Sequence, residues 1–504
     1  MQKKFLQVSF LLLGGFSAAL FFGFLWRYFP LVAFKYDWEP TDGDVLNQTH
    51  RLLKGLPLFS GWARGDILPP YPPLFYALLA TGKAFGADLV VYGRLLNLLC
   101  MVIVVCFGVL ILSEKTERGF RPGPAAFLFP ALFLSNYLTL EKCFYLRADA
   151  LLLFIQVCIA VLLVHRPNQL RPRLLGVLMG TLLWVKQTGV GTIIGSIGSL
   201  VLRRPERRVF GLIFLSFAIT FAALYAGFRA CGQTYLLHGL FLNPRAVYSG
   251  STLSLAHMEM RVVSFYSQLF WIAGLAILGL FFKKNSRLRP LVCLFLCETG
   301  ISFYCLQNQG ASSPYLWYHW FLICVFAAYA VEVLGSRWKL GAVLSCCGVA
   351  ALTLPNQKTL LSFEALDLEQ QQIVGKAHDV LIQSLVASAP TLKWISSREA
   401  TSIVRQGVIL DQDWCTMTTA YSRGAFSPQP LVTRLVGGEY SFAQLSKDSC
   451  GGGASQIRSA IESCFTLIRQ SVVVRFGAFL PVTILQYDGA KSECKRLSER
   501  SSTH

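Results

Sequence analysis

The sequence predicts an α-helical polytopic membrane protein with about eleven membrane-spanning helices, followed by a small α/β domain. Hydrophobic residues make up 54% of the 504 residues and charged residues only 14%, whereas soluble domains carry roughly 25% charged residues. Apolar runs close to the ~20 residues that cross a bilayer recur up to residue 354 and are absent after it. The chain therefore divides into a transmembrane module at 1–354 and an outside domain at 355–504.

The apolar runs give predicted spans at 8–26, 89–112, 124–140, 150–164, 174–186, 190–202, 209–228, 262–282, 290–306, 317–334 and 340–354. The first run follows Lys3 and Lys4, as the core of a signal peptide does. It is longer than a typical signal core, and many further spans follow it. We therefore interpret it as a retained helix.

The basic residues that give the net charge of +19 lie mostly in alternate loops between these spans. With a cytoplasmic N-terminus, every inside loop is basic, from Lys3 and Lys4 at the start to Arg337 and Lys339 before the last span, as the positive-inside rule requires. An odd number of spans then puts the C-terminal domain outside. Because the charge is accounted for by topology, a nucleic-acid partner is not expected.

The fifteen cysteines are not distributed as a single disulfide framework. Eleven lie in or beside predicted spans, where Cys is a small apolar residue. The outside domain holds the other four, Cys415, Cys450, Cys464 and Cys494. An oxidising compartment would allow one or two disulfides among them. No CxxC pair or His-Cys spacing predicts a zinc site.

The outside domain has segmental rather than continuous apolar patterning. It predicts helices at 370–387 and 456–468, and strands at 391–395, 407–410, 472–476 and 482–487. These elements indicate a small α/β domain.

The first outside loop, 27–88, is far too long for a simple connection. Four carboxylates lie within eight residues of it, at Asp37, Glu39, Asp42 and Asp44. Such a cluster can supply a general base or bind a divalent cation. It can equally be a solvated loop in which Asp44 caps the next helix. The residue pattern alone leaves both interpretations open.

Two amphipathic helices are predicted in this loop beside the membrane. The first, at 45–56, places apolar residues at helical spacing and ends at Gly55-Leu56-Pro57. The second, at 74–84, follows Pro72 and Pro73, whose fixed φ prepares a helix start.

Six short motifs and their order resemble the GT-C superfamily of membrane glycosyltransferases, in the branch of protein O-mannosyltransferases and lipid A aminoarabinose transferases. They are Asp42-Gly43-Asp44, Gly55-Leu56-Pro57, Tyr71-Pro72-Pro73, Gly93-Arg94-Leu95-Leu96-Asn97, Leu146-Arg147-Ala148-Asp149-Ala150 and Lys186-Gln187-Thr188-Gly189. The motifs cover about residues 30–200, and the rest is similar in topology alone.

The resemblance implies transfer of a sugar from a polyprenyl-phosphate carrier by an acidic residue of the first outside loop. The family's acidic position falls on Asp42, the first choice for the catalytic base, followed by Asp44 and Asp37. Many relatives have Lys-Pro-Pro where this chain has Tyr71, and that lysine is expected to meet the carrier phosphate. Tyr71 stays a candidate contact, but the phosphate charge must be met by other cations.

Three cations at the outer ends of spans are candidates for that role, because ionisable groups near membrane depth are usually paired or functional. Lys186 has no obvious acidic partner nearby in the sequence, which favours a phosphate contact. Arg147 can bind phosphate or pair with Asp149 or Glu141. Arg94 can bind the donor or anchor the helix at the interface.

His319 lies among the aromatic residues of 315–320. These residues can line a groove for a sugar or a prenyl chain, or form an interfacial aromatic belt. We count His319 among the candidate donor contacts.

These observations predict an inverting hexosyl- or pentosyltransferase in a bacterial inner membrane, with its C-terminal domain on the periplasmic side. The partners expected are a polyprenyl-phosphate-linked sugar, membrane lipid, and a lipid, glycan or protein acceptor. No cofactor is required, although the carboxylates near Asp42 can hold a divalent cation. The alternatives are a lipid-linked sugar flippase or other transporter, and an oligosaccharide polymerase or ligase.

Overall fold

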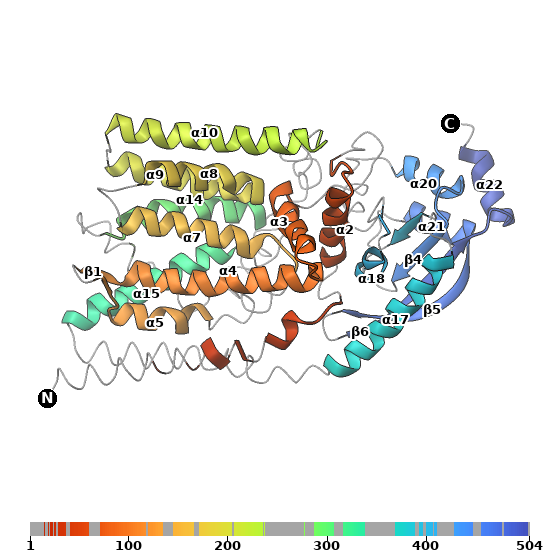
Figure 1. Cartoon of the computed structure of the whole chain (residues 1–504), viewed down its shortest axis with the longest axis horizontal. Helices are drawn as coiled ribbons and strands as arrows, with labels where there is room; N and C mark the ends of the chain where they lie inside the picture. The colour runs from red at the N-terminus through yellow and green to blue at the C-terminus, as the bar shows by residue number, and fades with distance from the viewer. Residues whose placement is uncertain are drawn as a thin grey trace.

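A computed structural model describes most of the chain: residues 29–36, 41–59, 71–116, 119–134, 145–165, 171–203, 206–234, 287–306, 316–337, 368–388, 393–396, 400–406, 408–410, 428–446, 455–475 and 478–501, with a few single positions. Within these residues, long helices lie side by side in a bundle (Figure 1). Two shorter helices stand across one end of the bundle, and the C-terminal α/β domain lies beyond them.

The bundle helices coincide with the predicted spans. They are α4 (Leu89–Leu112), α5 (Pro124–Leu134), α7 (Asp149–His165), α8 (Pro172–Val185), α9 (Val190–Arg203), α10 (Arg207–Ala230), α14 (Arg289–Leu306) and α15 (Trp317–Arg337). A hairpin of β1 (Glu114–Thr116) and β2 (Gly119–Arg121) joins α4 to α5. Among the described residues, α4 and α10 are long and apolar enough to cross a membrane. The predicted spans at 8–26, 262–282 and 340–354 lie largely outside the described residues.

Glycines let α9 and α14 pack closely. A Cβ on Gly191 would lie 2.9 Å from Oε1 of Glu298, and one on Gly195 would lie 2.7 Å from Cα of Leu294. Only a residue without a side chain fits at such distances. The close contact brings the carboxylate of Glu298 against α9.

The two helices across the end of the bundle are α2 (Thr41–Leu53) and α3 (Pro73–Ala84) (Figure 1). The predicted helix at 74–84 matches α3, whereas α2 begins before the predicted start at 45 and contains Asp44, so Asp44 does not cap it from a preceding loop. After α2 the chain reverses at Gly55, whose φ of 66° suits a residue without Cβ. There the N–H of Leu56 donates to the carbonyl of Arg51 at 2.8 Å. Pro73 occupies the start of α3, where its missing N–H costs no hydrogen bond.

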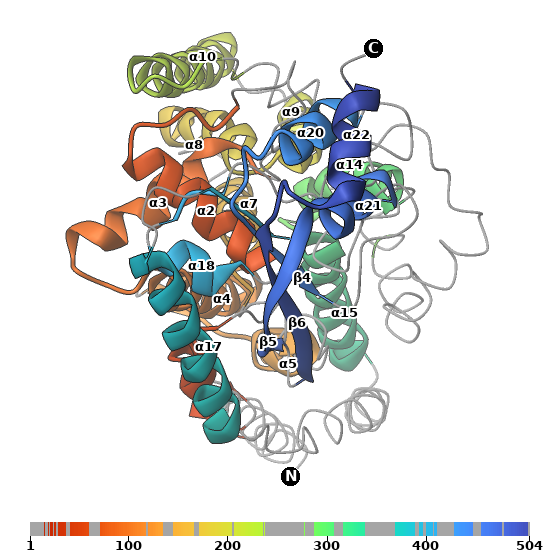
Figure 2. The same cartoon turned by 90° about the vertical axis from the view of Figure 1, so that its right-hand side faces the viewer.

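The C-terminal domain is a four-stranded sheet with helices on both sides. Its strand order is β3 (Trp394–Ser396), β4 (Phe442–Ser446), β6 (Ala478–Tyr487), β5 (Phe465–Arg475), and only the β3–β4 pair is parallel. Figure 2 shows α17 (Leu368–Ser388) on one side and α20 (Gln429–Val436), α21 (Ser455–Cys464) and α22 (Ser492–Ser501) grouped on the other. A disulfide between Cys464 and Cys494 ties α21 to α22. Cys415 and Cys450 lie outside the described residues.

Two expectations for this domain are wrong. Residues 408–410 form no strand, because the N–H and C=O of Leu410 bond the side-chain amide of Asn47 in α2, each at 3.0 Å, instead of a neighbouring strand. The helix predicted at 456–468 ends at Cys464. Phe465 begins β5, which pairs antiparallel with β6 up to Arg475.

The C-terminal domain is fastened to the first loop at α18 (Thr401–Arg405). A Cβ on Gly43 would lie 2.8 Å from the backbone nitrogen of Ala400, so the glycine of the Asp42-Gly43-Asp44 motif permits this contact. Arg405 pairs with Asp379 of α17 at 3.0 Å and with Asp88, the cap of α4, at 3.6 Å. The domain therefore sits directly over α2.

Candidate active site

Asp42 lies in the first turn of α2 and is fully enclosed. Its Oδ2 pairs with Nη2 of Arg94 at 2.9 Å, and both side chains are 0% exposed. Its Oδ1 accepts a hydrogen bond from the backbone N–H of Leu146 at 2.8 Å. Both carboxylate oxygens therefore connect α2 to other elements, one to α4 and one to the segment before α7.

Arg94 holds the chain before α2 as well as Asp42. Its guanidinium donates to the carbonyl of Tyr36 at 2.8 Å and to that of Phe34. The interfacial-anchor interpretation of Arg94 is wrong, because the side chain faces inward from α4 and is fully buried. Removing its charge partner would leave an uncompensated buried cation.

Residues 145–148 lead into α7 and set the position of Asp149, its first residue. The amide of Asn97, in α4, donates to the carbonyl of Tyr145 at 2.7 Å and to that of Arg147 at 3.2 Å. Together with the bond from Leu146 to Asp42, these contacts fix the backbone that leads into the helix. The guanidinium of Arg147 is partly exposed and lies 5.7 Å from the ring centroid of Tyr145.

Lys186 pairs with Asp149. Lys186 follows the last residue of α8, where the chain leaves the α-helix for the short 3₁₀ helix η2 (Gln187–Gly189). Its Nζ bonds Oδ1 of Asp149, and the two side chains are only 6% and 3% exposed. The partner that the sequence does not reveal is thus 37 residues away.

Tyr71 lies against this ion pair. Nζ of Lys186 is 5.5 Å from the centroid of the Tyr71 ring, a distance that permits a cation–π contact. The backbone N–H of Tyr71 donates to the hydroxyl of Tyr76 at 3.1 Å, which holds the residue at the start of α3. The ammonium of Lys186 therefore lies beside the ring of Tyr71.

Two of the three remaining candidates, Asp44 and His319, are among the described residues. Asp44 is buried in the first turn of α2. His319 is buried between α14 and α15, with its Nε2 2.9 Å from Oγ1 of Thr299 and its ring 4.5 Å from that of Phe295. Asp37 is not among the described residues.

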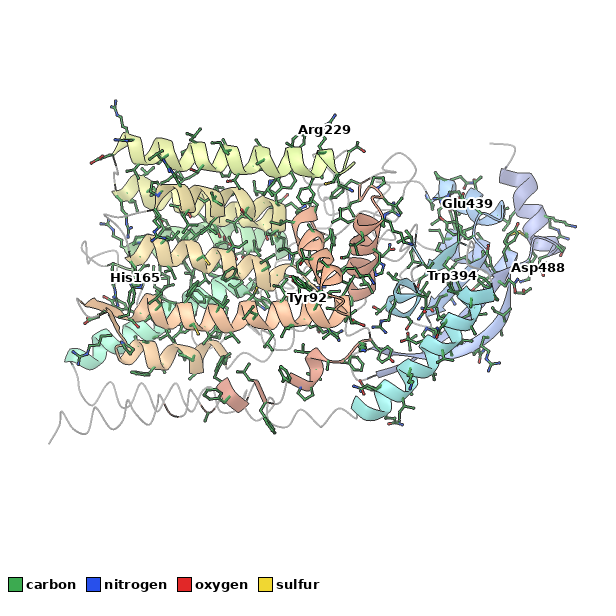
Figure 3. All side chains as sticks on the ribbon, in the orientation of Figure 1. Tyr92, His165, Arg229, Trp394, Glu439 and Asp488 are labelled. Atoms are coloured by element: carbon green, nitrogen blue, oxygen red, sulfur yellow. A yellow bond between two sulfur atoms is a disulfide. The ribbon has the colours of Figure 1, made fainter. Side chains whose placement is uncertain are left out.

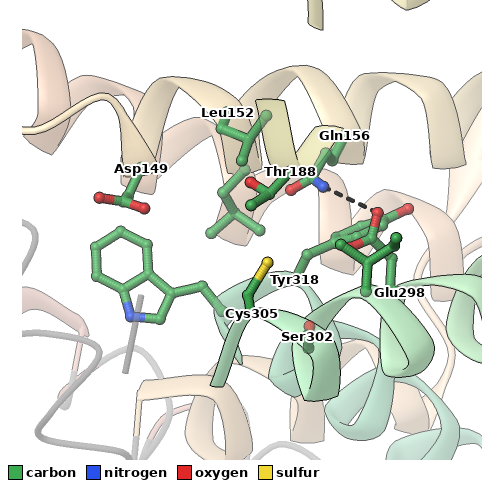
Figure 4. Close-up of a pocket in the computed structure, with 11 residues that line it drawn as sticks. Asp149, Leu152, Gln156, Thr188, Glu298, Ser302, Cys305 and Tyr318 are labelled. Atoms are coloured by element: carbon green, nitrogen blue, oxygen red, sulfur yellow. Dashed lines mark hydrogen bonds between the residues drawn. The ribbon is translucent and has the colours of Figure 1, made fainter. Parts of the chain in front are cut away.

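A polar cavity continues inward from Asp149, between α7, η2, α14 and α15. Figure 4 shows Asp149 at one end and Gln156 with Glu298 at the other. Thr188, Trp317 and Tyr318 also line it. Glu298 belongs to none of the six motifs, but it is the lone acidic residue of the apolar run 291–306, and a lone charge in such a run indicates a functional group.

Metal ligands are not gathered in the part of the chain that the structure describes. No group of three or more His, Cys, Asp or Glu side chains is placed there to hold an ion.

Neither a family model nor a curated protein matches the sequence. Solved structures of one protein are similar to it. ArnT from Cupriavidus metallidurans bound to undecaprenyl phosphate has a TM-score of 0.60 and 13% identity, and the same protein in the apo state has 0.59 and 13%. Each match covers 93% of this chain and 98% of that one.

The chain has the ArnT fold. The fold that the resemblance implies is thereby confirmed. Within this ArnT fold, motifs that are far apart in the sequence meet: Asp42 bonds Arg94 and Leu146, and Lys186 bonds Asp149.

Proposed function

We propose that the protein transfers a hexose or pentose from a polyprenyl-phosphate carrier to a hydroxyl acceptor at the outer face of a membrane. The observation that carries this proposal is the buried pair of Lys186 and Asp149 beside Tyr71, at the mouth of a polar cavity. The ArnT fold supports it, since one of the similar structures holds undecaprenyl phosphate.

The bundle would span a bacterial inner membrane, with the C-terminal domain on the periplasmic side. Figure 3 has Tyr92, in the first turn of α4, at the end near that domain and His165, the last residue of α7, at the opposite end. The basic residues that begin α10 and α14, Arg207 and Arg289, follow inside loops of the predicted topology. The acidic Asp42 and Asp149 begin helices that start at the other end.

Lys186 is our first candidate for the contact with the carrier phosphate. Its ammonium lies beside Asp149, which lines the cavity, and beside the ring of Tyr71, and an ammonium can donate up to three hydrogen bonds. The partly exposed Arg147, two residues before Asp149, supplies a second positive charge on the same segment. Arg94 acts on Asp42 rather than on the lipid, because its side chain is fully buried.

Asp149 is our first candidate for the general base. Its Oδ2 has no hydrogen-bond partner among the described residues and lines the cavity. The sequence ranked Asp42 first, but both oxygens of Asp42 are engaged and its side chain is 0% exposed. We therefore assign Asp42 to positioning Leu146 and, through residues 146–148, Asp149. Asp44 and Asp37 stay predictions.

The transfer would be a single displacement with inversion. The acceptor oxygen forms a bond to the anomeric carbon while the bond from that carbon to the phosphate oxygen breaks. Asp149 takes the acceptor proton, and polyprenyl phosphate leaves with the bonding electrons beside Lys186. The C-terminal domain, fastened over α2 by Arg405, would help to hold the acceptor.

The test compares cells that make the wild-type protein with cells that make only Asp149→Asn. We expect the Asp149→Asn cells to accumulate a polyprenyl-phosphate monosaccharide and to lack that sugar on an envelope lipid, glycan or protein, both measured by mass spectrometry. Glu462→Gln is the matched control, because this carboxylate is 57% exposed in a surface pair with Arg458. Identical lipid and glycan masses in wild-type and Asp149→Asn cells would contradict the proposal.

A further inference from the structure

The far end of the bundle, the end away from the C-terminal domain, carries a cluster of arginines. Figure 3 shows His165, the last residue of α7, at that end and Arg229 of α10 at the other. Helices α9, α10 and α14 each meet the far end with basic residues. They are Arg203 at the end of α9, Arg207 and Arg208 at the start of α10, and Arg287 and Arg289 around the start of α14.

Two acids at the far end do not neutralise this cluster. Glu206, which precedes α10, and Glu114, which follows α4, are exposed. Within the part of the chain that the structure describes, neither forms an ion pair with Arg203, Arg207 or Arg208. The positive charge of these arginines therefore remains uncompensated by them.

The packing of α9 on α14 sets the place of Arg203. A Cβ on Gly195 would lie 2.7 Å from Cα of Leu294. Four residues later on α9, Oγ of Ser199 donates at 2.6 Å to the carbonyl of Pro290, which lies four residues earlier on α14. The two helices therefore run antiparallel, and one further turn brings Arg203 beside the residues that lead into α14.

Arg287 is among these residues, and its guanidinium already has partners. It donates to the carbonyl of Leu112 at 2.8 Å and to that of Ser113, at the end of α4. These bonds satisfy carbonyls that a helix leaves unpaired at its C-terminus. Arg287 therefore adds positive charge near Arg203 rather than a partner for it.

The guanidinium of Arg203 is not satisfied within the described residues. Its side chain is half-buried, and Nη1 is enclosed without a hydrogen-bond partner among them. The adjoining sequence offers no acid: Arg204-Pro205 follows Arg203, and Lys283-Lys284-Asn285-Ser286 precedes Arg287. A guanidinium keeps its charge at any physiological pH. An enclosed charged donor without a partner indicates that an anion from outside the chain completes it.

The surface of α9 next to Arg203 is apolar. Ile194, Val201 and Leu202 are exposed large hydrophobic side chains. Ile194 and Val201 are seven residues apart and therefore lie on one face of the helix. A phosphate at Arg203 would have this apolar stripe of about two helical turns beside it, which fits the acyl chain of a lipid.

We propose that the far end of α9 and α14 binds an anionic phospholipid. The phosphodiester accepts hydrogen bonds from the guanidinium of Arg203, whose planar fork suits a phosphate, and one acyl chain lies along Ile194 and Val201. A zwitterionic lipid fits less well, because its own cationic group would meet the neighbouring arginines. The inference does not depend on the proposed sugar transfer and concerns the opposite end of the bundle.

Arg203→Gln tests the inference. Native mass spectrometry of the purified full-length protein measures its affinity for phosphatidylglycerol and, separately, for phosphatidylcholine. We expect wild type to bind phosphatidylglycerol at least about tenfold more tightly than phosphatidylcholine. Arg203→Gln should weaken phosphatidylglycerol binding about 10- to 100-fold, the loss of one charge-assisted contact, and leave phosphatidylcholine binding unchanged.

Arg208→Gln is the matched control, because it removes the same charge from the same end at an exposed position. It should weaken phosphatidylglycerol binding no more than about fivefold, the usual effect of one surface charge near an anionic lipid. Arg203→Lys keeps the charge but loses the planar fork, so its affinity should fall between those of wild type and Arg203→Gln. Inorganic phosphate at the same concentration should not displace the lipid, because it has no acyl chain.

Three results would each overturn the inference. Wild type could bind the two lipids equally. Arg203→Gln and Arg208→Gln could lose the same affinity, which would show only a general attraction of the lipid to basic loops. Inorganic phosphate could displace phosphatidylglycerol, which would show a site for a free anion. If Arg203→Gln does not fold, Arg203→Lys decides, and wild-type affinity in that variant would also overturn the inference.

Discussion

Lys186 and Asp149 form a buried ion pair at the start of α7, although they are 37 positions apart in the chain. The pair joins the break between α8 and η2 to the start of α7. Breaking a buried pair is costly when one partner remains, so both members are expected to stay together until a substrate charge arrives. The pair is therefore the point at which a phosphate and a base can meet.

Asp149→Asn should lower the rate of sugar transfer about 10²–10⁴-fold, the usual contribution of a positioned base. Each variant leaves a buried cation without its counter-charge, Lys186 in Asp149→Asn and Arg94 in Asp42→Asn, so both should lose about 3–5 kcal/mol of stability. Only Asp149→Asn should also lower the transfer rate of the folded protein. Transfer rates and thermal unfolding of the two purified variants check this. If the Asp42→Asn protein is stable but inactive while the Asp149→Asn protein transfers sugar at a nearly normal rate, Asp42 and not Asp149 is the general base.

The contact between α17 and β5 should weaken in acid. His378 in α17 bonds Oγ of Ser471 in β5 at 2.9 Å. Burial lowers the pKa of His378 from 6.5 to about 4, against a smaller raising effect of Asp379. Between pH 6.5 and pH 4 the unfolded chain therefore binds more protons than the folded one. The contribution of His378 to the free energy of unfolding is fully present above pH 6.5 and is lost as the pH falls toward 4.

Hydrogen–deuterium exchange of α17 in the full-length protein, corrected for the intrinsic pH dependence, measures this loss. His378→Gln has no ionisable ring and should flatten the response between pH 4 and 6.5. Equal pH dependence in wild type and His378→Gln would disprove the role of this histidine.

The disulfide between Cys464 and Cys494 should stabilise the C-terminal domain by about 2–4 kcal/mol, because it closes a long loop in the unfolded chain. Replacing both residues by Ala should speed proteolysis between α21 and α22 in the full-length protein. Cys231→Ala, which removes an exposed free thiol, should not. Two free thiols at 464 and 494 in the protein isolated from cells would argue against an oxidising location for the domain.

The sequence predicted much of the helix bundle and of the candidate site, because apolar runs set helix positions directly. The run at 89–112 coincides with α4, and the motifs around Asp42, Arg94, Leu146 and Lys186 do meet. Apolar patterning does not say how helices are rotated against each other. The pairing of Lys186 with Asp149 depends on that rotation and could not be derived.

Strand propensity also gave a wrong prediction where a distant side chain takes the backbone hydrogen bonds that a neighbouring strand would take. Val408, Ile409 and Leu410 favour a strand, but the amide of Asn47 takes both backbone groups of Leu410. The same bonds give Asn47 a structural role, with the side chain buried on α2. The place of Glu298 could not be derived from the sequence, because its partners Gln156 and Thr192 lie on two other helices, α7 and α9.

Binding of undecaprenyl phosphate to Lys186→Met tests most directly whether the ion pair is the carrier site. We expect affinity to fall about 10- to 100-fold, the loss of one charge-assisted contact. Lys83→Met, at an exposed lysine in the last turn of α3, should bind as wild type does. The double variant Lys186→Met with Asp149→Leu removes both buried charges, so it should fold well and still bind weakly. Wild-type affinity in Lys186→Met and in the double variant would contradict the account.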